Sequence, residues 1–275
     1  LNILESARHA GVKRVVFACS AAVYGDLPEL PKREDMPLKP LSPYAVDKLA
    51  SEHACKVYTH LYGLEAVALR YFNVFGPRQD PSSPYSGVIS IFSDCLRQGK
   101  QPTIYGDGEQ TRDFVFVSDV VEANIRAAAS ATSPGSAINI ATGNTLSIND
   151  LLRTICHIQG QPFAPRYLPG RQGDIQHSRA DIGLARQYLD WEPVIEFETG
   201  AFDPGPGRDV ARPLGDTRSD LPDREPVQVD AAACESGHHQ VGVGVPETGA
   251  HPRVAEVGHL GLRPGELASL LAGSG

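Results

Sequence analysis

Short apolar runs alternate with amphipathic stretches along the first 200 residues of the chain. Residues 1–10 have the apolar spacing of a helix, and VVFA at 15–18 is typical of a buried parallel strand. Ser42 as N-cap and Pro43 in the first turn predict a long helix, which Gly63 is suited to end. The chain therefore begins with a helix, a strand and a second helix.

Later segments continue this alternation. We expect strands at 66–70, 103–105, 114–117 and 137–141, and helices near 87–98, 119–130, 147–158 and 181–189. Strands that alternate with helices predict a mainly parallel sheet covered on both faces, which is an α/β fold.

Residues 200–275 differ in composition from the rest of the chain. They contain no Lys, Ile, Asn, Tyr or Trp, a single aromatic residue (Phe202), and many Gly and Pro. A segment of this composition is not expected to build a packed core. We expect either disorder or a shifted reading frame in GC-rich DNA, because the missing residue types largely have A/T-rich codons.

Composition limits the classes of protein to consider. The 275 residues are 41% hydrophobic and carry a net charge of -8, which argues against a surface that binds nucleic acid or membranes. No apolar run approaches the roughly 18 residues that span a bilayer. The five cysteines are scattered and form no CxxC pair, so we expect a reducing cytoplasm and no metal site.

The run SPYAVDK places Tyr44 and Lys48 four residues apart on the long helix, so both side chains lie on one face. A tyrosine with a pKa near 10 is a poor base at pH 7, and a nearby ammonium group favours its phenolate form. A decrease of about three units requires roughly 4 kcal/mol, of which Lys48 and the helix N-terminus can each supply part. The alternative is an ordinary exposed pair, because YxxxK also occurs by chance.

Ser20 follows directly on the first apolar strand. Open α/β sheets bind ligands at the carboxyl ends of their strands, where a hydroxyl can relay a proton or polarise a substrate hydroxyl held against Tyr44. The alternative is a serine that only caps the next turn.

Six longer motifs follow one another in order over residues 1–199. They are CSAAVYG at 19–25, SPYAVDK at 42–48, RYFNVFGPRQ at 70–79, RDFVFVSDVVEA at 112–123, GRQGD at 170–174 and HSRAD at 177–181. Their order and spacing resemble the extended short-chain dehydrogenase/reductases of the NAD-dependent epimerase/dehydratase family. Within it, the chain is most similar to UDP-glucose and UDP-N-acetylglucosamine 4-epimerases.

This resemblance implies catalytic roles for Ser20, Tyr44 and Lys48. In the family the tyrosine removes the proton of the sugar 4-hydroxyl, and the lysine holds the nicotinamide ribose of tightly bound NAD. Hydride passes to NAD, and the 4-keto sugar turns over and takes the hydride back on its other face. Tyr44 and Lys48 thus also bind the cofactor, and Phe72 and Val74 fall where the family touches the nicotinamide.

The resemblance also implies a UDP-sugar site. Its expected residues are Ser20; Asn73 at the diphosphate; Gly87, Val88, Thr103, Ile104 and Tyr105 around the nucleotide; Arg112 and Arg171 on the diphosphate; Asp174 at the ribose or uracil; and Ser178 beside the sugar. Without the family match each arginine would more often be a solvated charge, although its fork of donors suits phosphate oxygens. A residue as small as Ser178 implies that an N-acetyl group is accepted.

The resemblance divides the chain into a partial, NAD-binding Rossmann domain and a smaller α/β substrate domain. The first, the C-terminal part of a doubly wound parallel sheet, is expected at 1–76 and 114–142 and carries the catalytic residues. The second, which binds the nucleotide sugar, is expected at 77–113 and 143–199. The tail at 200–275 follows.

Two other functions stay open. Dehydratases of the family carry an Asp and Glu pair where this sequence has Ala21 and Ala22, and decarboxylases usually carry a Glu in this stretch, so both are less favoured than epimerisation. The other alternative is an inert fragment. The sequence has no GxxGxxG turn to hold the NAD pyrophosphate, and about the first hundred residues that the resemblance implies are absent.

The resemblance implies a homodimer formed through the N-terminal helix and the helix that begins at Ser42. It also implies a role in cytoplasmic nucleotide-sugar metabolism and polysaccharide biosynthesis.

Overall fold

The computed structural model describes residues 1–77, 79, 87–131, 133–171 and 174–201. The predicted tail lies outside these residues from position 202 onward. Its first two residues, Gly200 and Ala201, instead end helix α7 (Phe197–Ala201), which corrects the predicted boundary. Gly200 is buried, and a Cβ there would lie 2.7 Å from the Phe116 ring, so the close approach of these segments requires glycine.

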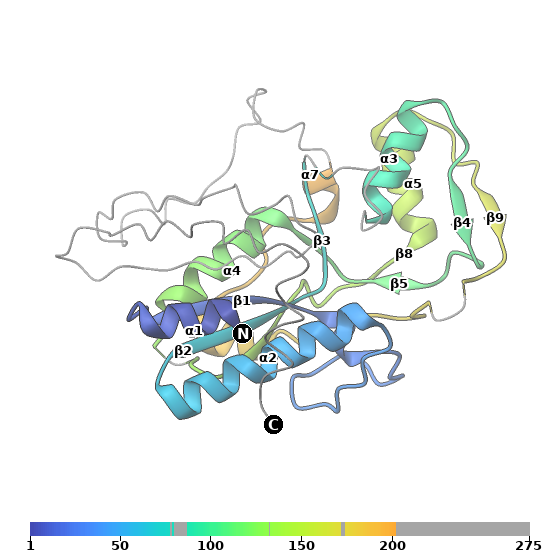
Figure 1. The fold of residues 1–275 in the computed structure, drawn as a ribbon. Helices are drawn as coiled ribbons and strands as arrows, with labels where there is room; N and C mark the ends of the chain where they lie inside the picture. The colour runs from blue at the N-terminus through green and yellow to red at the C-terminus, as the bar shows by residue number, and fades with distance from the viewer. Residues whose placement is uncertain (78, 80–86, 132, 172–173, 202–275) are drawn as a thin grey trace, which may run out of the picture. The chain divides into compact units, whose positions relative to one another are not determined.

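The order of helices and strands follows the alternation that the sequence predicts (Figure 1). The other helices are α1 (Asn2–His9), α2 (Pro43–Tyr62), α3 (Val88–Arg97), α4 (Val117–Ala129), α5 (Ile148–Ile158) and α6 (Gly183–Leu189), with a 3-10 helix, η1 (Ala21–Tyr24). The strands are β1 (Arg14–Ser20), β2 (Glu65–Tyr71), β3 (Asn73–Phe75), β4 (Thr103–Tyr105), β5 (Thr111–Arg112), β6 (Phe114–Phe116), β7 (Ala137–Ile140), β8 (Leu146–Ser147) and β9 (Arg166–Leu168).

The main sheet has the order β1-β2-β7, and all three strands are parallel. Its strands are buried almost throughout, since α2 packs against β1 and β2 and α4 packs against the same two strands (Figure 1). Strands covered in this way are near-continuous apolar runs, which explains the VVFA pattern. The predicted α/β class is therefore confirmed.

Helix α2 begins and ends at the predicted residues. The Ser42 hydroxyl accepts a hydrogen bond from the Ala45 amide at 3.2 Å, and Gly63 takes the left-handed conformation with φ +69°. A side chain at Gly63 would be strained in this conformation. The position of Tyr44 and Lys48 on the first turns of α2 thus follows from local sequence signals.

A second core lies under α3 and α5. Phe75 contacts Phe114 and Phe116 edge-to-face, with ring centroids 6.4 and 5.4 Å apart. Around it lie short strand pairs, of which β3-β6 and β4-β9 are parallel and β5-β8 is antiparallel. The second core positions β4 and β5, which carry several of the predicted substrate residues.

The segment around α6 packs differently from its predicted domain. Residues 143–199 are predicted to join the substrate domain, whereas Ala185, Leu189 and Trp191 are buried in the core of the main sheet. The Trp191 ring NH donates to the Asp119 carbonyl at 2.9 Å, which ties this segment to α4. The chain thus returns to the first core after α5 and β9.

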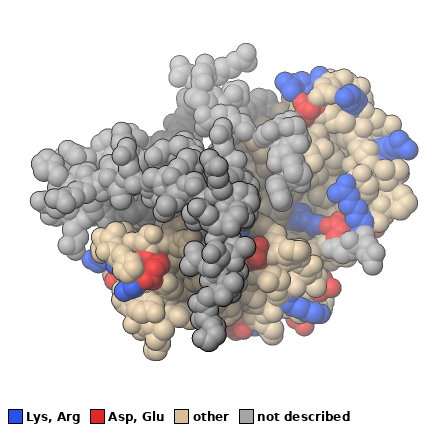
Figure 2. All heavy atoms as spheres, viewed as in Figure 1, with Lys and Arg blue, Asp and Glu red and all other residues tan. Residues whose placement is uncertain are grey.

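The described surface is mixed in charge. On the face drawn in Figure 2, Lys and Arg side chains are interspersed with Asp and Glu rather than gathered in one basic area. Among the described residues, none of the helices is long and apolar enough to cross a membrane.

Candidate active site

Ser20 lies at the carboxyl end of β1, opposite Tyr71 of β2. Its Oγ accepts a hydrogen bond from the Ala22 amide at 3.2 Å and so caps η1. This is the capping role that the sequence leaves open as an alternative. A hydroxyl that accepts one hydrogen bond still has its own proton to donate, so capping leaves Ser20 able to donate to a ligand.

Tyr44 and Lys48 meet above this end of β1. The Lys48 ammonium donates to the Ala18 carbonyl at 3.0 Å and lies 5.6 Å from the Tyr44 ring centroid. Burial lowers the pKa of Lys48, while the nearby Cys19 thiol opposes the decrease. Tyr44 is 49% exposed, so its side chain is open to a ligand. The geometry leaves the phenol accessible beside a half-buried cation.

The residues that follow β2 turn away from the main sheet. Phe72 is buried, and its amide donates to the Ile140 carbonyl at 3.1 Å. Asn73 is exposed, and Val74 is half-buried in β3, next to β6. Phe72 and Val74 therefore follow directly on the strand beside Ser20, where the sequence predicts the nicotinamide contacts.

Two predicted diphosphate residues, Arg112 and Arg171, lie with two predicted nucleotide residues, Tyr105 and Asp174, in a group that we call the arginine cluster. Arg112 donates to the Asp174 carboxylate at 2.7 Å, and the Arg171 guanidinium carbon lies 3.7 Å from the centroid of the Tyr105 ring. The Asp174 amide donates to the Arg171 carbonyl at 3.3 Å, which links the two pairs. The structure thus brings together residues separated by up to 69 positions in the sequence.

Burial lowers the pKa of Arg112, and Asp174 opposes this. Ser178 lies next to the cluster in the chain, and its amide donates to the Thr111 carbonyl at 3.1 Å. Because this contact uses the backbone, the Ser178 side chain can change without breaking it.

The other predicted nucleotide residues lie on the second core. Thr103, Ile104 and Tyr105 form β4, and Ile104 is 1% exposed, so its side chain faces the core rather than a ligand. Gly87 and Val88 begin α3, and the Gly87 carbonyl accepts a hydrogen bond from the Ser90 hydroxyl. Ile104 can therefore contact a nucleotide only through its backbone.

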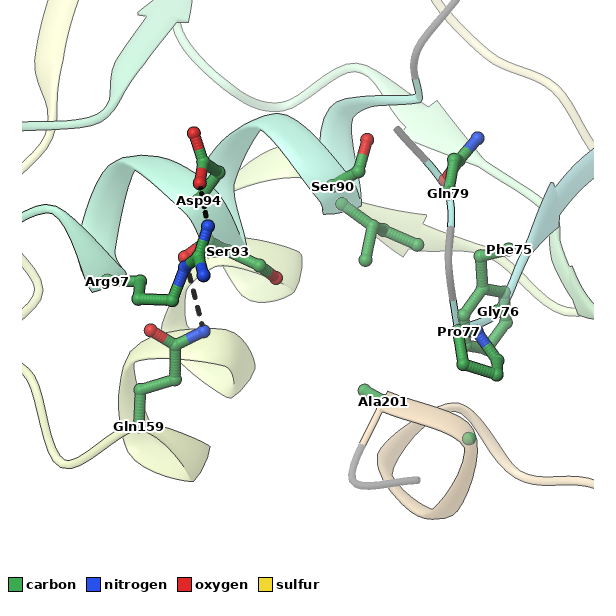
Figure 3. A pocket seen from close by; sticks show the side chains of 12 residues that line it. Phe75, Gly76, Pro77, Gln79, Ser90, Ser93, Asp94, Arg97, Gln159 and Ala201 are labelled. Atoms are coloured by element: carbon green, nitrogen blue, oxygen red, sulfur yellow. Dashed lines mark hydrogen bonds and ion pairs between the residues drawn. The ribbon is translucent and has the colours of Figure 1, made fainter. Parts of the chain in front are cut away.

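A cavity of about 280 Å³ is lined by residues of α3, of the end of β3 and of α7 (Figure 3). Among its polar side chains, Arg97 donates to the Asp94 carboxylate at 2.5 Å, and Gln159 donates to the Ser93 backbone carbonyl at 3.5 Å. None of the predicted site residues lines it. The cavity is therefore distinct from the candidate site.

Two buried groups near the site have no counterpart in the sequence-based predictions. Glu52, on α2, receives two hydrogen bonds from Arg70, at 2.8 and 2.7 Å. Burial raises the pKa of Glu52, but Arg70 outweighs this and holds the value at about 2. A charged residue inside an apolar strand, as in LRY at 69–71, indicates a buried charge at Arg70, but it does not identify Glu52 as the partner.

Asp113 is the second buried group. Its carboxylate accepts from the amides of Thr142, Gly143 and Ala180, at 2.8, 3.0 and 3.2 Å. It follows Arg112 directly, so it connects the strand that carries the arginine cluster to the end of β7. Burial raises its pKa, and these hydrogen bonds oppose the increase.

A serine at a strand end, next to a YxxxK helix on a parallel sheet, defines the short-chain dehydrogenase/reductase class of Rossmann-fold proteins. Residues 1–141 match the family model described as the NAD dependent epimerase/dehydratase family. The chain belongs to this family.

Known proteins resemble the chain over the same region. It is 42% identical over 201 residues to the UDP-glucose 4-epimerase of Mycolicibacterium smegmatis, an alignment that covers 73% of this chain and 64% of the relative. It is 40% identical, with a TM-score of 0.70, to a UDP-N-acetylglucosamine 4-epimerase from Methanobrevibacter ruminantium in complex with UDP-N-acetylmuramic acid, covering 73% and 64%.

The third similar protein is the UDP-glucuronic acid 4-epimerase of Bacillus cereus, solved with UDP-glucuronic acid and NAD. It is 32% identical with a TM-score of 0.67, covering 72% of this chain and 62% of that one. The predicted Rossmann fold is confirmed by these structures. The chain spans somewhat less than two thirds of the length of each of these three proteins.

Proposed function

We propose that the protein is an NAD-dependent epimerase that inverts C4 of a UDP-sugar through a 4-keto intermediate. One observation supports this most strongly: the Lys48 ammonium lies against the ring of the exposed Tyr44, at the strand end that carries Ser20. The similar proteins add weight, since all three are named as UDP-sugar 4-epimerases.

The residues divide the proton chemistry among them. Tyr44, as phenolate, takes the proton of the 4-hydroxyl while the C4 hydride leaves, and it returns the proton when hydride comes back to the other face. The positive charge of Lys48 favours the phenolate. Ser20 donates its free proton toward the sugar oxygen and keeps that oxygen near Tyr44. The nicotinamide, when bound, accepts and returns the hydride.

The residues present suit the nicotinamide end of NAD. Lys48 supplies a donor for ribose hydroxyls, and the half-buried Val74 supplies apolar contact just past the end of β2, where the buried Phe72 can contribute its backbone. The sequence contains no GxxGxxG turn for the pyrophosphate. We therefore assign the chain the nicotinamide part of the cofactor site.

We assign the UDP part of the substrate to the arginine cluster. Arg112 is mostly buried and Arg171 is stacked on Tyr105, so both guanidinium groups are held in place with donors that suit phosphate oxygens. Asn73, Gly87, Val88, Thr103, Ile104, Asp174 and Ser178 complete the proposed substrate site.

Dehydration and decarboxylation are less well supported. Ala21 and Ala22 form the first turn of η1, directly after Ser20, and neither side chain can act as an acid. Elimination of the sugar 6-hydroxyl needs a proton donor, whereas epimerisation needs only hydride transfer and one proton shuttle.

We further propose a homodimer formed through α1 and α2. Ile3, Val57 and Leu61 on these helices are 50%, 49% and 62% exposed, which is apolar surface that a partner would cover. Sedimentation equilibrium of wild type and Leu61→Asp tests this. We expect the mass of a dimer for wild type and a lower mass for Leu61→Asp, and equal masses for the two proteins would contradict the proposed interface.

We also propose a cytoplasmic location and a role in polysaccharide biosynthesis. The four described cysteines are free, as is usual in the reducing cytoplasm. The proposed products, UDP-sugars, suit polysaccharide biosynthesis.

Incubation with UDP-glucose and NAD tests the proposed activity, with proton NMR to detect UDP-galactose. A chimera with the glycine-rich segment of a relative added upstream is assayed in parallel. Activity in either form that Tyr44→Phe abolishes supports the proposal. Activity in the chimera alone would mean that this chain by itself is an inert fragment. If neither form is active, the proposal is contradicted.

A further inference from the structure

Arg70 lies near the carboxyl end of β2 and is 1% exposed. Besides its two hydrogen bonds to Glu52, it donates from Nη1 to the Tyr24 hydroxyl at 2.8 Å. That hydroxyl in turn donates to Asn139 Oδ1 at 2.7 Å. One buried guanidinium therefore joins α2, η1 and, through Tyr24, strand β7.

Two partners of this guanidinium, Glu52 and Tyr24, belong to elements that carry the proposed catalytic residues, and a third, the Glu34 carbonyl at 3.4 Å, lies between those elements in the chain. Tyr44, Lys48 and Glu52 follow one another at intervals of four on α2, so they lie on one face of the helix. Tyr24 ends η1, and Ser20 caps the start of that 3-10 helix. The guanidinium thus sets the position of the YxxxK face relative to the Ser20 turn.

Stability alone does not account for this arrangement. A fully buried ion pair is often no more stabilising than two apolar side chains of similar volume, because both charges lose their hydration. The planar fork does, however, fix the direction of each partner. This buried pair therefore contributes geometry that an apolar pair would not.

A second ion pair at the other end of the same strands provides a comparison. Arg14, at the start of β1, donates from Nε to Glu65 at 2.9 Å, and also to the Ala127 carbonyl at 3.1 Å. These contacts join β1 to β2 and to the end of α4. They lie at the amino edge of the sheet, away from Ser20.

We propose that Arg70 and Glu52 are positioning residues, which hold the Ser20 turn and the Tyr44–Lys48 face of α2 in register. The proposal rests on the proposed function, because it concerns the placement of residues assigned there as catalytic. Glu52 also receives a hydrogen bond from Lys56 at 2.8 Å and from the Cys19 thiol at 3.4 Å, so these groups respond to any change at Glu52 directly.

The test replaces both charges together. In Glu52→Met/Arg70→Met the buried pair becomes apolar, so the fold is expected to persist. The chain is labelled by reductive methylation with ¹³C-formaldehyde, and the Lys48 signal is assigned by its loss in Lys48→Arg. We expect the pKa of Lys48 to rise toward its ordinary value, because a loosened α2 lets water reach the ammonium. The matched control, Arg14→Met/Glu65→Met, is expected to leave it unchanged.

An unchanged Lys48 titration in a double variant that keeps its melting temperature would overturn the proposal. If the double variant does not fold, the pKa of Lys48 is compared between Arg70→Lys and Arg14→Lys instead. A pKa that Arg70→Lys leaves unchanged would then overturn the proposal. The measurement uses neither NAD nor a sugar nucleotide. A chain that lacks activity but shows the Lys48 shift thus supports positioning and counts only against the proposed function.

Discussion

The two halves of the candidate site are built in different ways. At the carboxyl edge of the main sheet, Lys48 is held at a backbone carbonyl and its helix is tied to a fully buried guanidinium. In the arginine cluster, Arg112 pairs with Asp174 and donates to the carbonyl of Thr111, its neighbour in the chain, and Asp174 is 32% exposed. The proposed proton-transfer half is therefore organised by the core, whereas the proposed anion-binding half is organised by charged pairs that a ligand can enter or replace.

This difference has a physical reason. Proton transfer requires reacting groups to be placed within fractions of an ångström before the substrate arrives. An anionic ligand, by contrast, can supply the charge that Arg112 shares with Asp174 and thereby order its own site. The following variants test whether the two regions respond as differently as their contacts indicate.

Tyr44→Phe is expected to have the largest effect. It removes the hydroxyl but keeps the ring beside Lys48, so the fold is unchanged and epimerisation falls by about 10²–10⁴-fold. The rate is measured by NMR on this chain or, if only the chimera is active, on the chimera. Tyr62→Phe, at the other end of α2, is the matched control because Tyr62 is also half exposed. Equal rates for wild type and Tyr44→Phe would remove Tyr44 from the chemistry.

Glu52→Gln probes the core-organised half through pH. The folded pKa of Glu52 is about 2, below its ordinary value of 4.5, so its carboxylate stabilises the fold above pH 4.5. This contribution, about 3 kcal/mol at most, is lost as pH falls from 4.5 toward 2.

The difference in unfolding free energy between wild type and Glu52→Gln should therefore shrink over that range in urea titrations. Glu5, whose pKa is also about 2, is present in both proteins, so its effect cancels. A difference that stays constant with pH would show that the Arg70 pair does not lower the pKa of Glu52.

Arg112→Ala tests the ligand-organised half. Hydrogen bonds between charged groups contribute about 1.5–3 kcal/mol, so the Kd for UDP should rise roughly 10- to 100-fold in calorimetry, with a small change in melting temperature. Arg97→Ala is the matched control, because Arg97 forms an exposed pair with Asp94 outside the cluster. If both variants bind UDP like wild type, the arginine cluster is not the diphosphate site.

Ser178→Tyr is expected to have the smallest effect. The Ser178 amide keeps its bond to Thr111, so the added bulk is expected to act on the proposed sugar pocket. We expect the kcat/KM ratio of UDP-N-acetylglucosamine to UDP-glucose to fall about tenfold, and Ser178→Ala to leave it near the wild-type value. An unchanged ratio in Ser178→Tyr would remove this residue from sugar selection.

Much of the fold follows from local signals in the sequence. The Ser42 cap, Gly63 and the VVFA run predict α2 and β1, because each acts within a few residues. The short strands β3, β5, β8 and β9 escape prediction, whereas β4 and β6, which are also three residues long, are predicted; segments this short carry too little periodicity to decide. The return of α6 to the first core depends on tertiary contacts such as that of Trp191 with Asp119.

The candidate site divides in the same way. Ser20, Tyr44 and Lys48 are found by motif, and the resemblance supplies the arginines that the structure then brings together. Arg70 and Asp113 escape, because a single charged residue near an apolar run does not reveal its buried partner. Such partners come from distant segments, as Arg70 and Glu52 show.

The most direct measurement of the central claim follows the C4 hydrogen itself. UDP-glucose deuterated at C4 is incubated with the active form of the protein, and the UDP-galactose formed is analysed by NMR and mass spectrometry. The account predicts that deuterium stays at C4, because the hydride leaves and returns within one bound complex. Product that has exchanged its C4 label for solvent hydrogen would contradict it.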